Sequence, residues 1–312
     1  MNKVIINSEN NNIRIDLALA SLTNHSRSMI QKLIKKGKIK KDSQIVERYH
    51  IKVLEGEEFE IDELPVASEN IIPQKGDLEI IFEDDYIIVL NKEAGLCVHP
   101  GAGQADNTLA NRLAAYSTLS DINGMDRMGI VHRLDKPVSG CMVIAKTNEV
   151  HLNLAQQFQD RLVQKEYVAI CYNTAETTSG TMEDKIGRCS RNRKKMACTK
   201  NGKESYMDYE VLEQTYIDHK IGFISKIKCK PKTGRMHQIR VQLSTRKLPI
   251  IGDEVYGRKK TEELKALMGE SIALHSNKLS FEHPVSKEQV HFGANIPDLF
   301  DLIPNALKTI KK

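Results

Sequence analysis

Residues 129–136 read Gly-Ile-Val-His-Arg-Leu-Asp-Lys and lead into an apolar run at residues 141–145. The pattern places one carboxylate, that of Asp135, in a loop just before a predicted strand, with the cations Arg133 and Lys136 close to it. Exposed ion pairs between an aspartate and its basic neighbours are common and weak, so a surface role is one interpretation. A catalytic carboxylate is the other, and the sequence on both sides of this segment decides between them.

Short strand patterns occur before and after this segment. The first two, at residues 78–82 and 86–90, are joined by a three-residue acidic turn and predict a hairpin. Apolar residues four positions apart predict a helix at residues 150–162. The order is irregular and no glycine-rich phosphate loop follows a strand, which argues against repeated βαβ units. We therefore predict a mixed α+β fold for residues 76–312, with later strands at residues 141–145, 167–172, 206–212, 223–228 and 239–243.

Residues 1–75 carry a separate pattern. Apolar residues at helical spacing predict one helix around residues 15–22 and a second around residues 29–34. Ser26 is the expected N-cap of the second helix and Gly37 its C-cap, and a short strand at residues 59–61 closes the unit. The segment from Glu63 to Pro73 is polar and contains prolines, which is typical of a linker between two domains.

The composition is that of a soluble protein, with 40% hydrophobic and 28% charged residues. No apolar run approaches the roughly 18 residues that a membrane span needs, and the chain does not start with an apolar signal segment. The six cysteines are scattered, without a C-x-x-C pair. This spacing predicts reduced thiols in the cytoplasm, and neither a disulfide framework nor a zinc site.

Basic residues gather in three stretches without acids, at residues 27–41, 185–203 and 220–240. Such blocks suit a polyanion whose phosphates are neutralised by lysine and arginine, and the net charge of +5 agrees with that partner. Solvated surface faces are the alternative for any single block, but three together favour a nucleic acid. In the N-terminal unit, the candidate RNA contacts on the second helix are Arg27, Lys32 and Lys35.

Residues 132–135, His-Arg-Leu-Asp, closely resemble the signature of the RluA-type family of RNA pseudouridine synthases. Residues 91–100 resemble its N-K-P-A-G-x-x-V-H-P segment, residues 165–167 its K-x-Y motif, and residues 232–241 its T-G-R-S/T-H-Q-I/L-R-V motif. Closing motifs follow at residues 249–257, 273–275 and 283–284, so the resemblance covers nearly the whole chain in order. The N-terminal unit resembles the S4 RNA-binding domain, a small α/β module that many members carry. The resemblance implies a mainly antiparallel catalytic sheet.

Isomerisation of uridine to pseudouridine requires that the N1–C1′ bond breaks, the base turns, and C5 joins C1′. A carboxylate near C1′ can attack that carbon or stabilise its developing positive charge, as in retaining glycosidases. The resemblance implies this role for Asp135, with the permanently charged Arg240 keeping the carboxylate ionised. It also implies that Tyr167 stacks on the flipped uracil near C5 and that Arg133 fills the gap left in the RNA. A core aromatic of its strand is the alternative role for Tyr167.

Four further residues of these motifs are expected to support the site. His132 is interpreted as a hydrogen-bonding structural residue, Leu134 as part of the signature loop, and Asn91 and Lys92 as the floor of the site. No pair of histidines has the spacing of metal ligands and the reaction needs none, so we expect neither a metal nor a cofactor.

The members that carry an S4 domain resemble this chain best, which implies a uridine in large-subunit ribosomal RNA as the substrate. The expected partners are RNA and the large ribosomal subunit or its assembly intermediates, and we expect a monomer without membrane contact. A transfer-RNA pseudouridine synthase is the alternative within the family. A catalytically silent RNA-binding factor for ribosome assembly is the alternative outside it, and the presence of Asp135, Tyr167 and Arg240 counts against that.

Overall fold

The computed structural model describes residues 2–23, 25, 27–62, 71–101, 104, 106–117, 119–120, 128–192 and 195–309. Within these ranges the chain forms two β-sheets, and separate clusters of buried apolar residues pack against each of them. The expected N-cap Ser26 and most of the expected linker, residues 63–70, lie outside the described residues.

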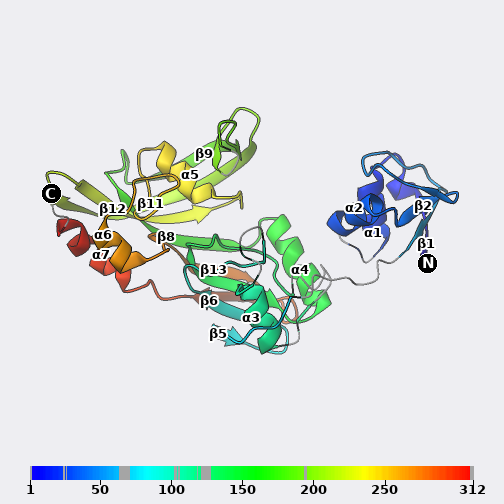
Figure 1. Ribbon diagram of the computed structural model, residues 1–312, viewed down its shortest axis with the longest axis horizontal. Helices are drawn as coiled ribbons and strands as arrows, with labels where there is room; N and C mark the ends of the chain where they lie inside the picture. Colours follow the sequence, from blue (N-terminus) through cyan, green and yellow to red (C-terminus); the bar gives the residue numbers. More distant parts are fainter. Residues whose placement is uncertain are drawn as a thin grey trace.

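The first sheet belongs to the N-terminal unit and is antiparallel, with the strand order β1-β4-β2-β3. Its apolar face is covered by the two helices, and both predicted helices are confirmed (Figure 1). Gly37 adopts a φ of +66° after the second helix, and Lys38 donates its N–H to the carbonyl of Leu33, so the expected C-cap is confirmed. The elements are β1 (Asn2–Ile5), η1 (Ser8–Asn10), α1 (Ile15–Leu22), α2 (Arg27–Lys35), β2 (Ile39–Lys41), β3 (Gln44–Ile45) and β4 (Glu58–Ile61).

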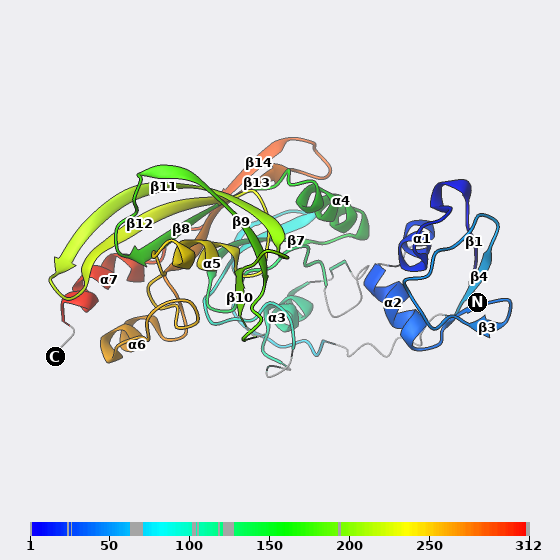
Figure 2. The ribbon, with the colours of Figure 1, turned by 90° about the horizontal axis from the view of Figure 1, so that it is seen from above.

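The second sheet has ten strands in the order β10-β9-β11-β12-β8-β13-β7-β6-β5, with β14 paired to β13. All of its pairings are antiparallel except that of β13 with β7, which confirms the predicted mainly antiparallel sheet. Figure 2 shows the long strands β11 and β12 running side by side along the curve of the sheet. The strands are β5 (Glu79–Glu83), β6 (Ile87–Lys92), β7 (Ser139–Ala145), β8 (Gln164–Tyr172), β9 (Ser179–Arg188), β10 (Met196–Cys198), β11 (Lys203–Asp218), β12 (Gly222–Pro231), β13 (Leu274–Glu282) and β14 (Gln289–Gly293).

Helices cover both faces of the central strands. Ile88 and Leu90 of β6 belong to the large cluster that includes α3, α6 and α7, whereas Ile87 and Val89 pack into a second cluster that includes α4. Successive side chains of a strand point to opposite faces, so a strand buried on both faces has a continuous apolar sequence. The helices are α3 (Leu109–Tyr116), α4 (Asn148–Gln159), α5 (Gln238–Thr245), α6 (Glu262–Met268) and α7 (Leu299–Lys308).

The prediction of a strand at residues 239–243 is wrong, because these residues lie in the helix α5. Apolar and polar residues alternate there, which is the pattern of a strand with one solvated face. Here the two polar side chains are buried as well: Arg240 is bonded to Asp253, and Gln242 donates to Asp184. The alternation therefore does not mark a solvent-facing side, and the period-two pattern is misleading.

The helix predicted at residues 150–162 is confirmed, but it ends earlier than expected, at Gln159. Arg161 has a left-handed backbone with a φ of +63°, and Leu162 is 63% exposed. This turn brings the chain from α4 directly into β8.

The first residues after the undescribed linker pack with the larger unit. Ile71 belongs to the large apolar cluster, Gln74 donates its N–H to the carbonyl of Asn111, and the Asn111 side chain donates to the carbonyl of Ile72. Residues 71–75, which the sequence pattern groups with the N-terminal unit, thus contact the domain that follows.

Candidate active site

A cavity of about 930 Å³ opens beside the loop that carries Asp135. Its walls come from residues 131–138, the end of α4, the start of β8 and residues 231–240. Among the described residues that line it, Asp135 is the single carboxylate, whereas the basic ones are Arg133, Lys136, Arg161, Lys165, Lys232, Arg235 and Arg240. Strongly positive walls around one carboxylate suit an anionic substrate chain.

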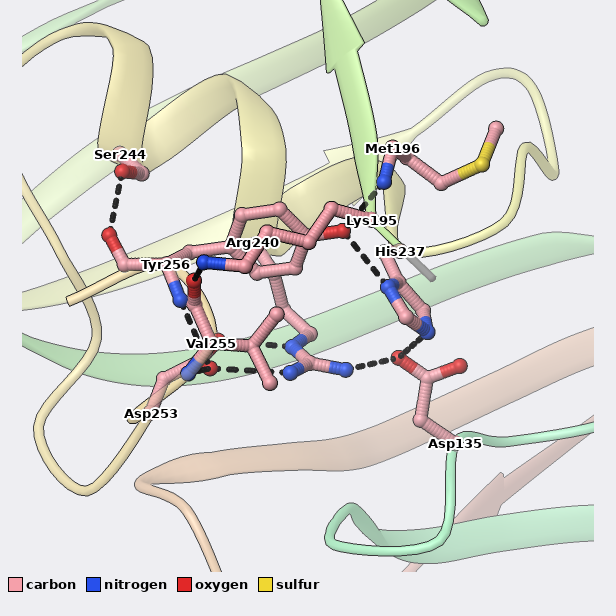
Figure 3. Close-up of polar contacts among 9 residues, drawn as sticks. All are labelled: Asp135, Lys195, Met196, His237, Arg240, Ser244, Asp253, Val255 and Tyr256. Carbon is pink, nitrogen blue, oxygen red and sulfur yellow. Dashed lines mark hydrogen bonds and ion pairs between the residues drawn. The ribbon is translucent and has the colours of Figure 1, made fainter. Parts of the chain in front are cut away.

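Arg240 on α5 connects Asp135 to a second, fully buried carboxylate. Its Nη1 donates to Asp135 Oδ2 at 2.9 Å, while Nε and Nη2 donate to the two oxygens of Asp253 at 2.7 and 2.9 Å (Figure 3). Asp253 is 1% exposed and also accepts the backbone N–H groups of Val255 and Tyr256. The fork-like contact with Asp253 fixes the guanidinium plane and aims the remaining nitrogen at Asp135.

The charge of Arg240 is permanent in this setting. Burial by itself lowers the pKa of its guanidinium, but the hydrogen bonds and charges of Asp253 and Asp135 outweigh burial and raise that pKa above its ordinary value. The aromatic ring of Tyr256 lies 5.0 Å from the guanidinium carbon and covers it. The Asp135 side chain therefore faces a cation that neither titrates nor moves freely.

His237, at the N-terminus of α5, is the other group near Asp135. Its Nε2 lies 3.8 Å from Asp135 Oδ2, and its Nδ1 lies 2.7 Å from the hydroxyl of Tyr256. That hydroxyl already accepts the N–H of Met196, so its own proton is available for Nδ1. Burial lowers the pKa of His237, which favours a neutral ring. These contacts together assign the remaining ring proton to Nε2, the nitrogen that faces Asp135.

Tyr167 stands on β8 with its side chain buried at the wall of the cavity. Burial raises the pKa of its hydroxyl to about 12, although a hydrogen bond with Ser276 acts in the opposite direction. The hydroxyl therefore remains protonated at neutral pH, and the residue offers a neutral aromatic surface and one polar group. A direct role as a base would require another group to accept the tyrosine's own proton.

The two basic neighbours of Asp135 differ in their surroundings. Lys136 forms an ion pair with Glu270 at 2.8 Å. Arg133 is exposed at the cavity, and its guanidinium has no hydrogen-bond or ion-pair partner within the described ranges. Only Arg133 of this pair is thus free to enter a bound nucleic acid.

His132 and Leu134 hold the signature loop in place. The Nε2 of His132 accepts the backbone N–H of Val143 at 3.0 Å, and its ring stacks on Phe158 with centroids 4.5 Å apart. Burial lowers the pKa of His132 to about 3, so the ring is neutral, as an acceptor must be. Leu134 is buried in the large apolar cluster. His132 and Leu134 thus anchor the loop, and they alternate with the charged residues Arg133 and Asp135 along the wall of the cavity.

Lys92 supports the same loop through the carbonyl of Lys136, whereas the side chain of Asn91 points away from the cavity to Glu79. The buried Nζ of Lys92 donates to the carbonyls of Glu93, Leu96 and Lys136, at 2.7, 2.9 and 3.4 Å. Burial lowers the pKa of this ammonium to about 8. The side chain of Asn91 donates to Glu79 and is not among the residues that line the cavity.

The three candidate RNA contacts of α2 are not alike. Arg27 donates to Asp16 at 2.9 Å, and this fully buried carboxylate also accepts from Arg14 and Gln31. Arg27 therefore ties α2 to α1. Lys32 and Lys35 are exposed, and Lys35 lies over the ring of Tyr49, so these two residues remain candidates for RNA contacts.

The sequence interpretation assigned no role at the site to three residues around Asp135, namely Asp253, Tyr256 and His237, although each lies within a family motif. The signal was present, because Asp253 follows an apolar run in a Gly-Asp pair and Tyr256 follows three residues later. Neither pattern reveals that both residues contact Arg240.

Across the part of the chain that the structure describes, no group of three or more His, Cys, Asp or Glu side chains could hold a metal ion. In the same ranges, none of the helices combines the length and the apolar character needed to cross a membrane.

Comparisons with known proteins point to one family. Residues 86–245 match the family model described as RNA pseudouridylate synthase. The chain is 34% identical to an uncharacterized RNA pseudouridine synthase of Bacillus subtilis over 99% of both chains. It is 39% identical to the ribosomal large subunit pseudouridine synthase D of Zymomonas mobilis, over 93% of this chain and 92% of that protein.

The fold has a counterpart among solved structures. Human RNA pseudouridylate synthase domain containing 1 superposes with a TM-score of 0.57 at 24% identity, covering 75% of this chain and 96% of the human one. At this identity the likeness concerns the fold.

Proposed function

The chain belongs to the RNA pseudouridylate synthase family, and on this premise we propose that it isomerises uridines of large-subunit ribosomal RNA with Asp135 as the nucleophile. The enzyme class follows from the family: the protein is an RNA pseudouridine synthase. The ribosomal target is supported by several relatives named as ribosomal large subunit pseudouridine synthases, at 37–40% identity.

The observation that carries the role of Asp135 is its pairing with Arg240 in a cavity where the other charged side chains among the described lining residues are lysines and arginines. The carboxylate attacks C1′ as the N1–C1′ bond breaks, and the uracil leaves with the bonding electron pair. The base then turns, C5 attacks C1′, and the C1′–O bond to Asp135 breaks. Loss of the C5 proton and protonation of N1 complete the isomerisation, so atoms and electrons balance without a cofactor.

Access to the uridine requires that the base leave its stack, at a cost of a few kcal/mol. The unpaired guanidinium of Arg133 is suited to fill the gap in the RNA. Tyr167, which also lines the cavity, provides the aromatic surface for the flipped base.

The test is tritium release from RNA transcribed with 5-tritiated uridine, because isomerisation frees the hydrogen at C5. Large-subunit ribosomal RNA and a pool of transfer RNA are compared under the same conditions. We expect release from the ribosomal transcript. Release from transfer RNA alone would indicate a transfer-RNA pseudouridine synthase. No release from either RNA would support a catalytically silent RNA-binding factor for ribosome assembly.

The N-terminal unit, which the sequence pattern extends to residue 75 but whose boundary the packing of Ile71 revises to residue 70, is proposed as an S4-like RNA-binding domain. The support is a separate apolar core around α1 and α2 and the exposed Lys32 and Lys35. We further propose that the enzyme acts as a monomer in the cytoplasm, on the large ribosomal subunit or its assembly intermediates, since that is where such an RNA is modified.

A further inference from the structure

Lys165 lies on the wall of the cavity, two residues before Tyr167 on β8. Alternate side chains of a strand share a face, so those of Lys165 and Tyr167 point to the same side, and their backbone positions lie about 6.6 Å apart along the strand. Glu166, between them, points to the other face and pairs with Lys230 and Lys278. The strand itself therefore gives Lys165 no counter-anion.

The ammonium of Lys165 has no hydrogen-bond or ion-pair partner within the described ranges. The other two lysines of the cavity are both paired, Lys136 with Glu270 and Lys232 with Asp208, each at 2.8 Å. Lys165 is also the more buried group, and burial lowers its pKa. A partly buried, unpaired ammonium is costly, and it becomes favourable when an anion arrives.

Among the described residues, the groups around Lys165 offer no such anion. His132 is neutral and stacked on Phe158, and the charge of Lys165 itself helps to lower the pKa of His132. The turn after α4 adds another cation, Arg161, to the wall. Asp135 is the single carboxylate among the described residues that line the cavity, and it is already hydrogen-bonded to Arg240.

We propose that Lys165 binds a phosphate of the RNA chain next to the flipped uridine. This inference rests on the proposed function, because it takes Tyr167 as the surface under the base. With the base on Tyr167, the sugar–phosphate chain passes the position two residues earlier on the strand, where Lys165 stands. A full positive charge is matched by a phosphate and only partly by a neutral uracil oxygen. Lys165 is thus a positioning residue on a rigid strand, and it sets the depth at which the nucleotide enters.

The test uses the full-length protein and large-subunit ribosomal RNA transcribed in vitro. Dissociation constants are measured over a range of salt for the wild type, Lys165→Met, Lys165→Arg and Lys308→Met. The last variant is the charge-matched control, since Lys308 is exposed at the end of α7.

For Lys165→Met we expect about tenfold weaker binding at low salt. The slope of log K against log salt should flatten by about 0.7 to 0.9, which corresponds to one phosphate neutralised by the protein. Lys165→Arg should restore the slope, and Lys308→Met should leave it unchanged. An unchanged slope for Lys165→Met would overturn the proposal, and if the single-turnover rate fell at the same time, the contact would be with the base.

A stability measurement excludes a structural explanation. Lys165→Met removes a partly buried unpaired charge at similar volume, so its melting temperature should equal or exceed that of the wild type. A clear decrease would mean that the lysine has a partner within the fold, and would count against a phosphate site. The salt slope requires only binding, whereas tritium release by the wild type tests isomerisation, so the two proposals can fail separately.

Discussion

Asp135 faces a guanidinium that a buried carboxylate holds in position. The Asp135 side chain is 22% exposed, whereas those of Arg240 and Asp253 are 5% and 1% exposed. The proposed nucleophile is therefore the most accessible of the three side chains, and the two groups that would orient it are almost wholly enclosed. Substitution of Asp135 should therefore lower the reaction rate, whereas substitution of Asp253 should lower both the rate and the stability of the fold.

Asp135→Asn should fold and bind RNA within a few-fold of the wild type. Its amide oxygen can still accept from Arg240, but it cannot attack C1′. We expect the single-turnover rate of tritium release to fall by at least about a thousandfold. Activity within tenfold of the wild type would show that another group is the nucleophile.

Asp253→Asn should lower both stability and activity, because it leaves Arg240 buried with a single counter-charge. Loss of one partner from a buried ion pair costs about 3 kcal/mol of unfolding free energy, measured by urea denaturation. The matched control is Glu262→Gln, whose ion pair with Lys265 is solvent-exposed, so its loss should change the unfolding free energy much less. Equal effects of the two substitutions would contradict the orienting role of Asp253.

His132 makes stability depend on pH in a defined window. Its pKa is about 3 in the folded protein and about 6.5 in the unfolded chain, so the unfolded state binds more protons between these values. The stabilising effect of the neutral ring is complete above pH 6.5 and is lost as the pH falls towards 3. Between pH 7 and pH 5 the wild type should lose about 2 kcal/mol more unfolding free energy than His132→Gln. If the unfolding free energies of the two proteins changed with pH in parallel, protonation of the His132 ring would not destabilise the fold.

At the scale of elements, the site depends on the parallel contact between β7 and β13. Gly140 on β7 pairs with Ser276 of β13 and has a φ of +120°. A Cβ built at this position would lie 2.2 Å from the backbone oxygen of Ser276. Only glycine allows the two backbones to come this close. The contact joins β7, which follows the Asp135 loop, to β13, which carries Ser276, the hydrogen-bond partner of Tyr167.

Gly140→Ala should therefore destabilise the protein by more than about 2 kcal/mol, or prevent folding. The control is Gly222→Ala, because Gly222 has a φ of +76° but no atom within 4 Å of the added Cβ. It should lose only about 1 kcal/mol from backbone strain. Both variants are compared by urea denaturation, and a loss for Gly140→Ala no larger than that of the control would show that the strands can separate at this point.

At the scale of the whole molecule, the N-terminal unit has its own sheet and its own apolar cluster. The proposed catalytic residues Asp135, Tyr167 and Arg240 all lie in the larger unit. RNA affinity and catalysis should therefore be separable by truncation, if the cut respects the packing of residues 71–75.

Removal of residues 1–70 should leave a folded enzyme that still isomerises uridine. It should bind structured ribosomal RNA more weakly, and its salt slope should be flatter by about 0.7 to 0.9 for each phosphate that the N-terminal unit neutralises in the full-length protein. Removal of residues 1–75 should give a less stable protein, because it also deletes Ile71 and the hydrogen bond from Gln74 to Asn111. Salt titrations and melting curves of both truncations check this, and identical melting temperatures would contradict the revised boundary.

Local patterns in the sequence determined much of this molecule. The helices of the N-terminal unit, the strands around the His-Arg-Leu-Asp motif and the position of Asp135 before a strand depend on near neighbours along the chain. Side-chain periodicity and capping report such features because the backbone imposes them within a few residues. The ordered motifs likewise indicated the family, which the comparisons confirm.

Tertiary structure alone decided what surrounds Asp135. The Asp135–Arg240 bond joins residues 105 positions apart, and Asp253 secures Arg240 from another loop. Residues 239–243 of the helix α5 have the alternating sequence of a strand, but the polar side chains of Arg240 and Gln242 are buried and hydrogen-bonded, so burial outweighs the local pattern. The K-x-Y motif includes Lys165, but only the fold shows that its ammonium is partly buried with no anionic partner among the described residues. Partners and burial depend on how distant segments pack, and a linear pattern does not contain that information.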